Sequence, residues 1–176
     1  MTTARLEETG PILSLIAATP ALLLAEDEGG AEIAAGLGVA PPADWPPEHN
    51  DEATRAWMRE LLEDYPHEPG YGTWYIVAGG RLTGVCGFKG PPNADGEVEL
   101  GYSIVAADQR RGLAAEATRM LVARAFRDPR VTLVMAHTLP PLVGSQKVLA
   151  RNGFIHVGGY IDAEEGQVMR FEVRRG

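Results

Sequence analysis

The segment from Glu97 to His137 constrains the fold most, because it reads as a strand, a turn, a helix and a second strand in direct succession. Residues 97–105 alternate polar and apolar side chains, and residues 112–126 repeat apolar side chains at helical spacing. Residues 131–137 are mostly apolar and partly β-branched, as is typical of a buried strand. The segment therefore predicts a β-α-β unit.

Apolar runs and turn residues predict the remaining elements. We expect further strands at residues 11–17, 72–78, 81–89, 154–160 and 168–173, and further helices at residues 20–30, 50–64 and 144–151. Gly79-Gly80 suits a tight hairpin turn, so the strands on either side of it should pair antiparallel. The predicted order is β-α-α-β-β-β-α-β-α-β-β, and the proline-rich residues 36–50 form a surface loop that could gate a substrate. Neither a repeat nor a linker divides the chain, so we expect a single domain over residues 1–176.

Composition and charge argue against several classes of protein. The formal net charge of -8 opposes binding to phosphate backbones, so no nucleic-acid partner is expected. The single cysteine cannot form an intramolecular disulfide, and no cluster predicts a metal. Residues 1–9 lack the pattern of a signal peptide, and no run approaches the roughly 20 apolar residues that span a bilayer. We therefore expect no membrane partner and a cytoplasmic location.

The turn before the long helix predicts an anion site. The first amides of a helix have no intrahelical partner and carry the positive end of the helix dipole, which favours a pyrophosphate. Gly112 and Ala114 would let a phosphate reach backbone N–H groups, and Arg110 and Arg111 can pair with its oxygens. Taken alone, a plain strand-turn-helix connection explains this turn equally well. Dinucleotide-binding and P-loop motifs are both missing from the sequence.

Four short runs stand out between Glu99 and Phe154. They are Glu99-Leu-Gly-Tyr-Ser, Gln109-Arg-Arg-Gly-Leu-Ala, Glu116-Ala and Ser145-Gln-Lys-Val-Leu-Ala-Arg-Asn-Gly-Phe154. Together they resemble the GNAT superfamily of acyl-CoA N-acyltransferases, and within it the bacterial RimJ/RimL type of ribosomal-protein N-terminal acetyltransferase. The resemblance is specific over about residues 73–154, whereas the first seventy residues share only the order of elements.

The resemblance implies an α/β (α+β) fold with a mixed, mostly antiparallel central sheet of about seven strands flanked by helices. The sheet would be splayed between the strand that ends at Val105 and the strand that ends near His137. Acetyl-CoA would be the co-substrate, with its pantetheine arm in the gap and its pyrophosphate on the turn. No metal is implied. The cofactor-binding residues expected in this way are Ile104, Val105, Gln109, Arg110, Arg111, Gly112, Leu113, Ala114 and Ala115.

Glu99 and Ser145 are the candidate catalytic residues. Period-two alternation places Glu99 on the polar face of its strand, where partial burial would raise its pKa, although spacing alone favours an ion-paired strand carboxylate. Ser145 alone would be interpreted as a cap or as bonding to the preceding turn. The resemblance implies that Glu99 is the general base and that Ser145 is the acid, and Glu97, on the same face of the strand, is the alternative base. Leu149 stands where many members have a catalytic tyrosine, and Leu142 where the branch has a pantetheine-binding asparagine.

Three further residues are interpreted as structural. Trp57 shares a helical face with other apolar residues and is expected in the core. His137 is interpreted as a histidine at the end of a strand rather than as a catalytic group. Cys86 is expected to be a small buried apolar residue, because no local histidine would activate it.

These observations predict an N-acetyltransferase that transfers an acetyl group from acetyl-CoA to a primary amine by direct attack on the thioester. The acceptor is expected to be a protein N-terminus or a small-molecule amine, and the protein a monomer or homodimer. The alternative is a non-catalytic acyl-CoA-binding sensor or partner-binding domain on the same fold. The cofactor turn does not distinguish an amine from a hydroxyl acceptor, or an acetyl group from a longer acyl chain.

Overall fold

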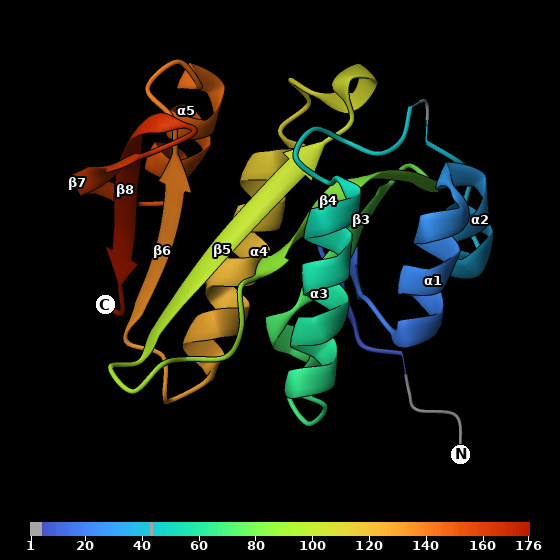
Figure 1. The fold of residues 1–176 in the computed structure, drawn as a ribbon, viewed down its shortest axis with the longest axis horizontal. Helices are drawn as coiled ribbons and strands as arrows, with labels where there is room; N and C mark the ends of the chain where they lie inside the picture. The colour runs from blue at the N-terminus through green and yellow to red at the C-terminus, as the bar shows by residue number, and fades with distance from the viewer. Residues whose placement is uncertain (1–4, 43) are drawn as a thin grey trace.

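The computed structural model describes residues 5–42 and 44–176, and in this part of the chain eight strands form one sheet between two layers of helices (Figure 1). The strands are β1 (Glu7–Thr9), β2 (Ser14–Ala17), β3 (Thr73–Ala78), β4 (Arg81–Phe88), β5 (Glu97–Ile104), β6 (Leu133–Thr138), β7 (Ile155–Asp162) and β8 (Gly166–Arg174). The helices are α1 (Pro20–Glu28), α2 (Gly30–Leu37), α3 (Glu52–Asp64), α4 (Leu113–Arg127) and α5 (Val143–Arg151), with short 3-10 turns η1 (Pro69–Tyr71) and η2 (Ala106–Asp108).

The sheet is open, mixed and mostly antiparallel, as predicted. Its strand order is β1-β2-β3-β4-β5-β6-β8-β7, and only β5 and β6 pair in parallel. The β5–β6 ladder runs from the pair Glu97–Leu133 to the pair Glu99–Met135. Because β5 continues to Ile104 and β6 to Thr138, the two strands diverge toward their carboxyl ends. The expected splay between these strands is therefore confirmed.

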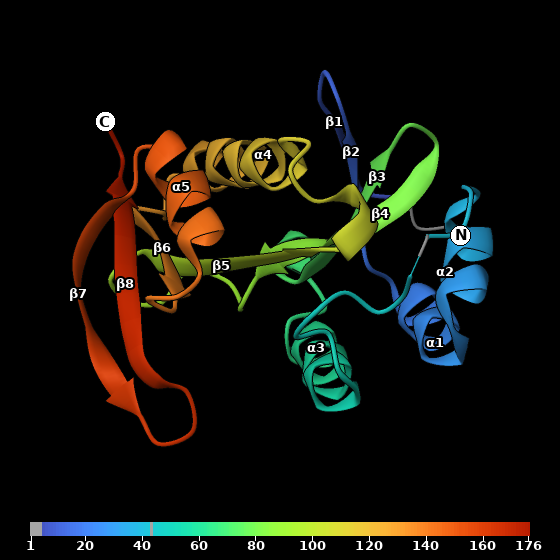
Figure 2. The same ribbon diagram turned by 90° about the horizontal axis from the view of Figure 1, so that it is seen from above.

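The two faces of the sheet carry different helices (Figure 2). Helices α4 and α5 lie on one face, and α1, α2 and α3 lie on the other. A large apolar core fills the first interface, and a smaller core lies around α1 and α2. Helix α3 differs from the other helices because none of its side chains is buried.

Local sequence signals explain where most of these elements begin. The hydroxyl of Thr19 caps α1, accepting from the Leu22 amide at 3.2 Å, and proline follows at the first helical position. The carboxylate of Asp51 caps α3 in the same way, at 2.8 Å from the Thr54 amide. Glycine in the left-handed region ends α2 at Gly38. None of the helices in the described part of the chain is long and apolar enough to cross a bilayer.

Two elements were not predicted. Strand β1 has only three residues, and they show no apolar alternation because two of them are glutamates. Helix α2 occupies residues that we expected to end one helix and begin a loop, because the Gly29-Gly30 pair separates two short helices instead of ending the helical region. The sheet therefore has one strand more than the expected seven, and the helix expected at residues 50–64 begins at Glu52.

Candidate active site

The turn before α4 lies at the carboxyl end of β5, where the gap between β5 and β6 is open (Figure 1). Gly112 forms the N-cap with φ 77°, a left-handed conformation that favours glycine. No side chain in the described part of the chain caps this helix, and a Cβ at Gly112 would meet no atom within 4 Å. The first amides of α4 are thus open to a ligand, as an anion site requires.

The side chains of this turn mostly fix its shape. Gln109 donates from Nε2 to the Ile104 carbonyl at 3.0 Å, and Arg111 donates to Oδ1 of Asp108 at 3.1 Å. Asp108 is fully buried and also pairs with Arg81. Of the two arginines expected to bind phosphate, Arg111 is therefore held by a carboxylate, and Arg110 is exposed with φ 63°. A ligand at the turn would meet the amides and Arg110 first.

The backbone of β5 presents alternate residues to the gap. The Val105 amide donates to Thr83 of the β4 side at 2.9 Å, and the Val105 carbonyl accepts from Asp108 at 2.9 Å. The Val105 amide thus has a partner within the chain, and its carbonyl, which can accept a second hydrogen bond, is left for the predicted contact with pantetheine. Because the ladder alternates, Tyr102 and Ile104 direct their backbone groups away from β4, toward the gap.

Tyr102 is a candidate functional residue that the sequence did not reveal. Its hydroxyl lies 2.9 Å from Oγ of Ser145 and donates to the Ser145 carbonyl at 3.2 Å. Burial raises the pKa of Tyr102, although the hydrogen bond to Ser145 opposes this effect. Period-two alternation puts Tyr102 on the same face as the apolar residues Leu100 and Ile104, and so predicts a core residue. The sequence carried no signal that its ring would lie beside the gap and reach α5.

Glu99 lies on the opposite face of β5, in a cluster of charged and polar groups. Its Oε1 atom accepts from Nζ of Lys89 at 2.6 Å and from Nδ1 of His137 at 2.8 Å. Burial acts to raise the pKa of Glu99, but the hydrogen bonds and positive charge of Lys89 and His137 lower it below the ordinary carboxylate value. The expected rise in this pKa is therefore wrong, because the sequence did not reveal either partner.

The cluster around Glu99 also fixes the orientation of His137. Since an ionised carboxylate only accepts hydrogen bonds, Nδ1 of His137 must be the donor in this contact. The edge of the ring packs against Tyr160, with ring centroids 5.7 Å apart. His137 thus has a structural role beyond its place at the end of a strand, because its hydrogen bond orients the Glu99 carboxylate.

The structure places the two predicted catalytic residues on different faces of the sheet. Glu99 lies with Lys89 and His137 on the face that also carries α3. Ser145 lies on α5, on the face that carries α4. The gap between β5 and β6 connects the two faces, so both residues can act on one molecule only if that molecule passes through the gap.

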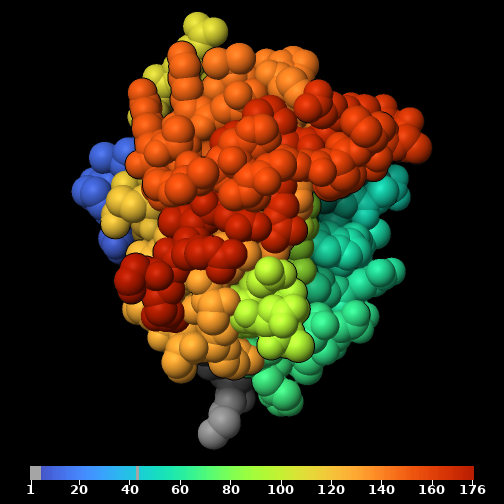
Figure 3. All heavy atoms as spheres, turned by 90° about the vertical axis from the view of Figure 1, so that its left-hand side faces the viewer, coloured from blue at the N-terminus to red at the C-terminus, as the bar shows by residue number. Residues whose placement is uncertain are grey.

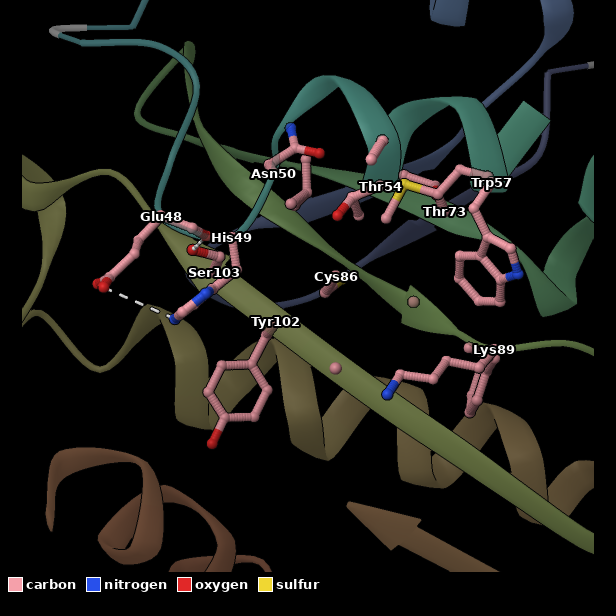
Figure 4. Close-up of a pocket in the computed structure, with 16 residues that line it drawn as sticks. Glu48, His49, Asn50, Thr54, Trp57, Thr73, Cys86, Lys89, Tyr102 and Ser103 are labelled. Atoms are coloured by element: carbon pink, nitrogen blue, oxygen red, sulfur yellow. Dashed lines mark hydrogen bonds and ion pairs between the residues drawn. The ribbon is translucent and has the colours of Figure 1, made fainter. Parts of the chain in front are cut away.

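Two cavities lie on the α3 face and share Lys89. The first, about 630 Å³, lies between α3 and strands β4 and β5 (Figure 4). The second, about 600 Å³, is lined by Glu99, His137 and Tyr160. Trp57 lines the first cavity and is 40% exposed, so its expected place in the core is wrong.

The loop before α3 is tied to β5 at the rim of the first cavity. Ser103 donates from Oγ to the Glu48 carbonyl at 2.6 Å. Asn50 is buried and donates to Glu26 at 2.6 Å, and Tyr75 donates to the same carboxylate at 2.7 Å. These bonds hold the expected gating loop against the sheet.

The β7–β8 hairpin forms the other wall of this face. Figure 3 shows β7 and β8, in orange and red, covering that end of the molecule beside α3, in teal. In Figure 2 the turn of the hairpin projects toward the same side of the sheet as α3. The polar face of β5 therefore lies between a helix and a hairpin that are far apart in the sequence.

The remaining candidates occupy simpler environments. Glu97 accepts from Asn93 at 3.1 Å, and Leu149 is buried as a core residue. Cys86 is 4% exposed, and burial raises the pKa of its thiol, which confirms its structural role. Leu142 is 39% exposed. Among residues 5–42 and 44–176, no group of His, Cys, Asp and Glu side chains is arranged to hold a metal ion.

Comparison with known proteins identifies the family of this chain. Residues 31–155 match the family model of the acetyltransferase (GNAT) domain. The chain is 31% identical over 121 residues to the uncharacterized N-acetyltransferase YjdG of Bacillus subtilis (strain 168), covering 68% of this chain and 71% of YjdG.

Solved structures share the fold at lower identity. RimL, a ribosomal L7/L12 alpha-N-protein acetyltransferase in complex with coenzyme A, superposes with a TM-score of 0.71 at 20% identity, covering 95% of this chain and 96% of RimL. The microcin C7 self-immunity acetyltransferase MccE, in complex with acetyl-CoA and AMP, gives a TM-score of 0.67 at 15% identity, with 94% of each chain covered.

The fold and the family match define an acyl-CoA-dependent acetyltransferase. The chain belongs to the GNAT acetyltransferase family. The predicted resemblance to this superfamily is confirmed, and the fold shared with RimL agrees with the predicted RimJ/RimL-type branch.

Proposed function

We propose that this protein transfers the acetyl group of acetyl-CoA to a primary amine, either a protein N-terminus or a small-molecule amine. The observation that carries the proposal is the divergence of β5 and β6 after the pair Glu99–Met135. This opening has the uncapped start of α4 at one end, Ser145 on one face and Glu99 on the other. The coenzyme A and acetyl-CoA complexes of RimL and MccE support the choice of co-substrate.

The pyrophosphate of acetyl-CoA would bind the backbone amides from Arg110 to Ala115. One helix N-terminus stabilises an anion by only about 0.3–1 kcal/mol when exposed, so further contacts are needed. The exposed Arg110 guanidinium and the gap-facing backbone groups of Tyr102 and Ile104 can supply them. The pantetheine arm would therefore follow β5 into the gap and carry the thioester toward Tyr102.

A buried hydroxyl offers one more contact for this arm. Oγ1 of Thr138, at the end of β6, is buried and has no hydrogen-bond partner in the described part of the chain. Thr138 alternates with Val134 and Ala136, which belong to the core beneath α4 and α5. The hydroxyl could thus replace the hydrogen bond that the branch usually obtains from an asparagine and that Leu142 cannot make.

The transfer would use groups on both faces of β5. The neutral amine attacks the thioester carbon, a C–N bond forms and the C–S bond breaks. The proton lost by the amine passes to Glu99, directly or through water, and His137 keeps the carboxylate oriented. The departing thiolate takes a proton from the Ser145 hydroxyl, which lies 2.9 Å from the Tyr102 hydroxyl. Ser145 regains a proton from water and Glu99 releases its proton to solvent, so both groups return to their starting states.

The proposal is tested by measuring coenzyme A release from acetyl-CoA with peptides of varied N-termini, polyamines and amino-sugar antibiotics as acceptors. Acceptor-dependent release with at least one amine is expected, together with saturable acetyl-CoA binding by calorimetry. Binding without release across the panel would favour the non-catalytic acyl-CoA-binding domain. Failure to bind acetyl-CoA would remove both functions.

A further inference from the structure

Helix α3 is amphipathic, yet its apolar face is only partly covered: Leu62 packs against the smaller core, whereas Trp57 is 40% exposed. The helix spans thirteen residues and buries none of them. Ala53, Trp57 and Met58 line the cavity between α3 and the sheet. The Trp57 ring hangs from α3 toward the strands (Figure 4). An apolar helix face that stands over a cavity, instead of packing on the sheet, is suited to covering an apolar ligand.

The opposite wall of this cavity is also apolar. Val85 of β4 lines it with its side chain, together with the backbone of Gly87 on β4 and of Gly101 on β5. Its volume of about 630 Å³ lies within the roughly 300–1,000 Å³ that is usual for small-molecule sites. The cavity can therefore hold a hydrophobic group larger than a single methyl or ethyl substituent.

Gly101 connects this cavity to the reaction centre. A Cβ at Gly101 would meet no atom within 4 Å, so the face of β5 is open at this residue. Glu99 lies two residues earlier on the same face, which is about 7 Å along a strand. A molecule whose apolar part fills the cavity can thus present an amine near Gly101, between Glu99 and the gap.

The charges around the cavity disfavour an acceptor with several positive charges. Lys89 lies where the two cavities meet, and its ammonium group is bound to Glu99. Glu48 is the carboxylate of the lining, but its side chain is 75% exposed and lies near His49. A second ammonium group would leave water for apolar walls and a neighbouring lysine without gaining a buried partner.

We infer that the acceptor is a monoamine attached to one apolar body, and that this body packs between Trp57 and the β4–β5 face of the sheet. The inference rests on the proposed function and narrows its acceptor. Polyamines and amino-sugar antibiotics are poor substrates on this reasoning. Peptides with a large apolar N-terminal side chain, and alkyl or arylalkyl amines, are good ones.

A matched pair of acceptors tests the inference. Hexylamine and the diamine of the same chain length differ by one terminal ammonium group, and coenzyme A release gives kcat/KM for each. Hexylamine should be better by about tenfold or more, because the cavity cannot pair the second charge. Equal or better turnover of the diamine would overturn the inference and leave the proposed function standing.

Two variants test whether hexylamine binds in this cavity. Trp57→Ala and Gly101→Leu should each raise KM for hexylamine by about tenfold, with acetyl-CoA affinity unchanged, because one removes a wall and the other fills the space. Tyr65→Ala is the matched control, since Tyr65 lies just beyond α3, is 42% exposed and does not line the cavity. The inference fails if Trp57→Ala and Tyr65→Ala behave alike.

Measuring hexylamine binding directly tests the inferred acceptor site without requiring acetyl transfer. Calorimetry of hexylamine against the protein saturated with coenzyme A should detect binding that Gly101→Leu weakens. If acetyl-CoA binds and neither amine is acetylated, absence of hexylamine binding overturns the inference. If acetyl-CoA does not bind at all, the proposed function itself has failed.

Discussion

The two faces of β5 are built in opposite ways. Toward α4 and α5, Val98, Leu100 and Ile104 are buried in the larger core. Toward α3, Glu99 and Gly101 border cavities, and the covering helix buries none of its side chains. The side chains of β5 therefore pack into the core on one face and line cavities on the other. The gap between β5 and β6 lets a substrate reach both faces.

The sharpest test of this comparison is removal of the carboxylate on the hollow face. Glu99→Gln should lower kcat by about 100- to 10,000-fold, because a general base contributes this much, while acetyl-CoA affinity stays the same. Glu97→Gln, two residues earlier on the same face, is the control and should stay close to wild type. Steady-state coenzyme A release measures both, and similar losses in the two variants would contradict the assignment of Glu99.

The second test concerns the turn at the end of the strand. Gly112→Val places a β-branched residue at φ 77°, which costs about 1–3 kcal/mol of folding free energy and screens the first amides of α4. Acetyl-CoA affinity should fall by about tenfold or more, as calorimetry would show.

A second glycine provides the control for backbone strain. Gly38→Val meets the same strain at φ 76°, and a Cβ there would also meet no atom within 4 Å, but it lies at the end of α2. Both variants should lose similar stability in urea, and only Gly112→Val should lose affinity. An equal loss of affinity would show that the turn has no special part in binding.

A smaller effect is expected from the hydroxyl pair on the packed face. Ser145→Ala and Tyr102→Phe should each lower kcat by about tenfold, and the double variant should lose little more, because the two hydroxyls share one hydrogen bond. Ser103→Ala removes a hydroxyl from the other face of β5, which bonds the loop before α3, and should change the KM of the amine instead of kcat. If the losses of kcat in the two single variants add up in the double variant, the two hydroxyls act independently and the expectation is wrong.

The smallest effect is the pH dependence of stability. Burial opposes ionisation of Glu99, but Lys89 and His137 lower its pKa in the folded state below the ordinary carboxylate value. Its stabilising contribution is thus present above the ordinary pKa and is lost as the pH falls through the folded value. Urea unfolding of wild type and Glu99→Gln should differ near neutral pH and converge in acid. A difference that grows as the pH falls would contradict this direction.

The sequence predicted the elements whose signals are local. Strand β5, the turn at Gly112 and helix α4 all lie within one short segment, so their order and the predicted anion site followed from periodicity and helix capping. Strand β1 and helix α2 were not predicted, because each is too short to show a clear repeat of apolar residues. The position of the splay came from family resemblance, since no local pattern states where two paired strands separate.

The surroundings of Glu99 could not be predicted from the sequence. Lys89 reaches Glu99 because β4 and β5 pair in one particular register, and His137 lies on β6 two residues beyond Met135, the ladder partner of Glu99. Alternation identifies the face of a side chain and says nothing of the side chain on the next strand. The prediction that Trp57 lies in the core was wrong for the same reason, because helical spacing identified an apolar face without showing that a cavity lies opposite that face.

The partly covered face of α3 has a consequence for how such a chain can diverge. Most substitutions that damage proteins act through loss of buried packing, and α3 has no fully buried side chain to lose. Changes at its exposed, cavity-lining residues therefore cost little folding free energy and act mainly on which molecules the cavity admits. A duplicated copy of the gene could exchange one acceptor for another by drift in a single helix, while the machinery that handles the thioester stays untouched.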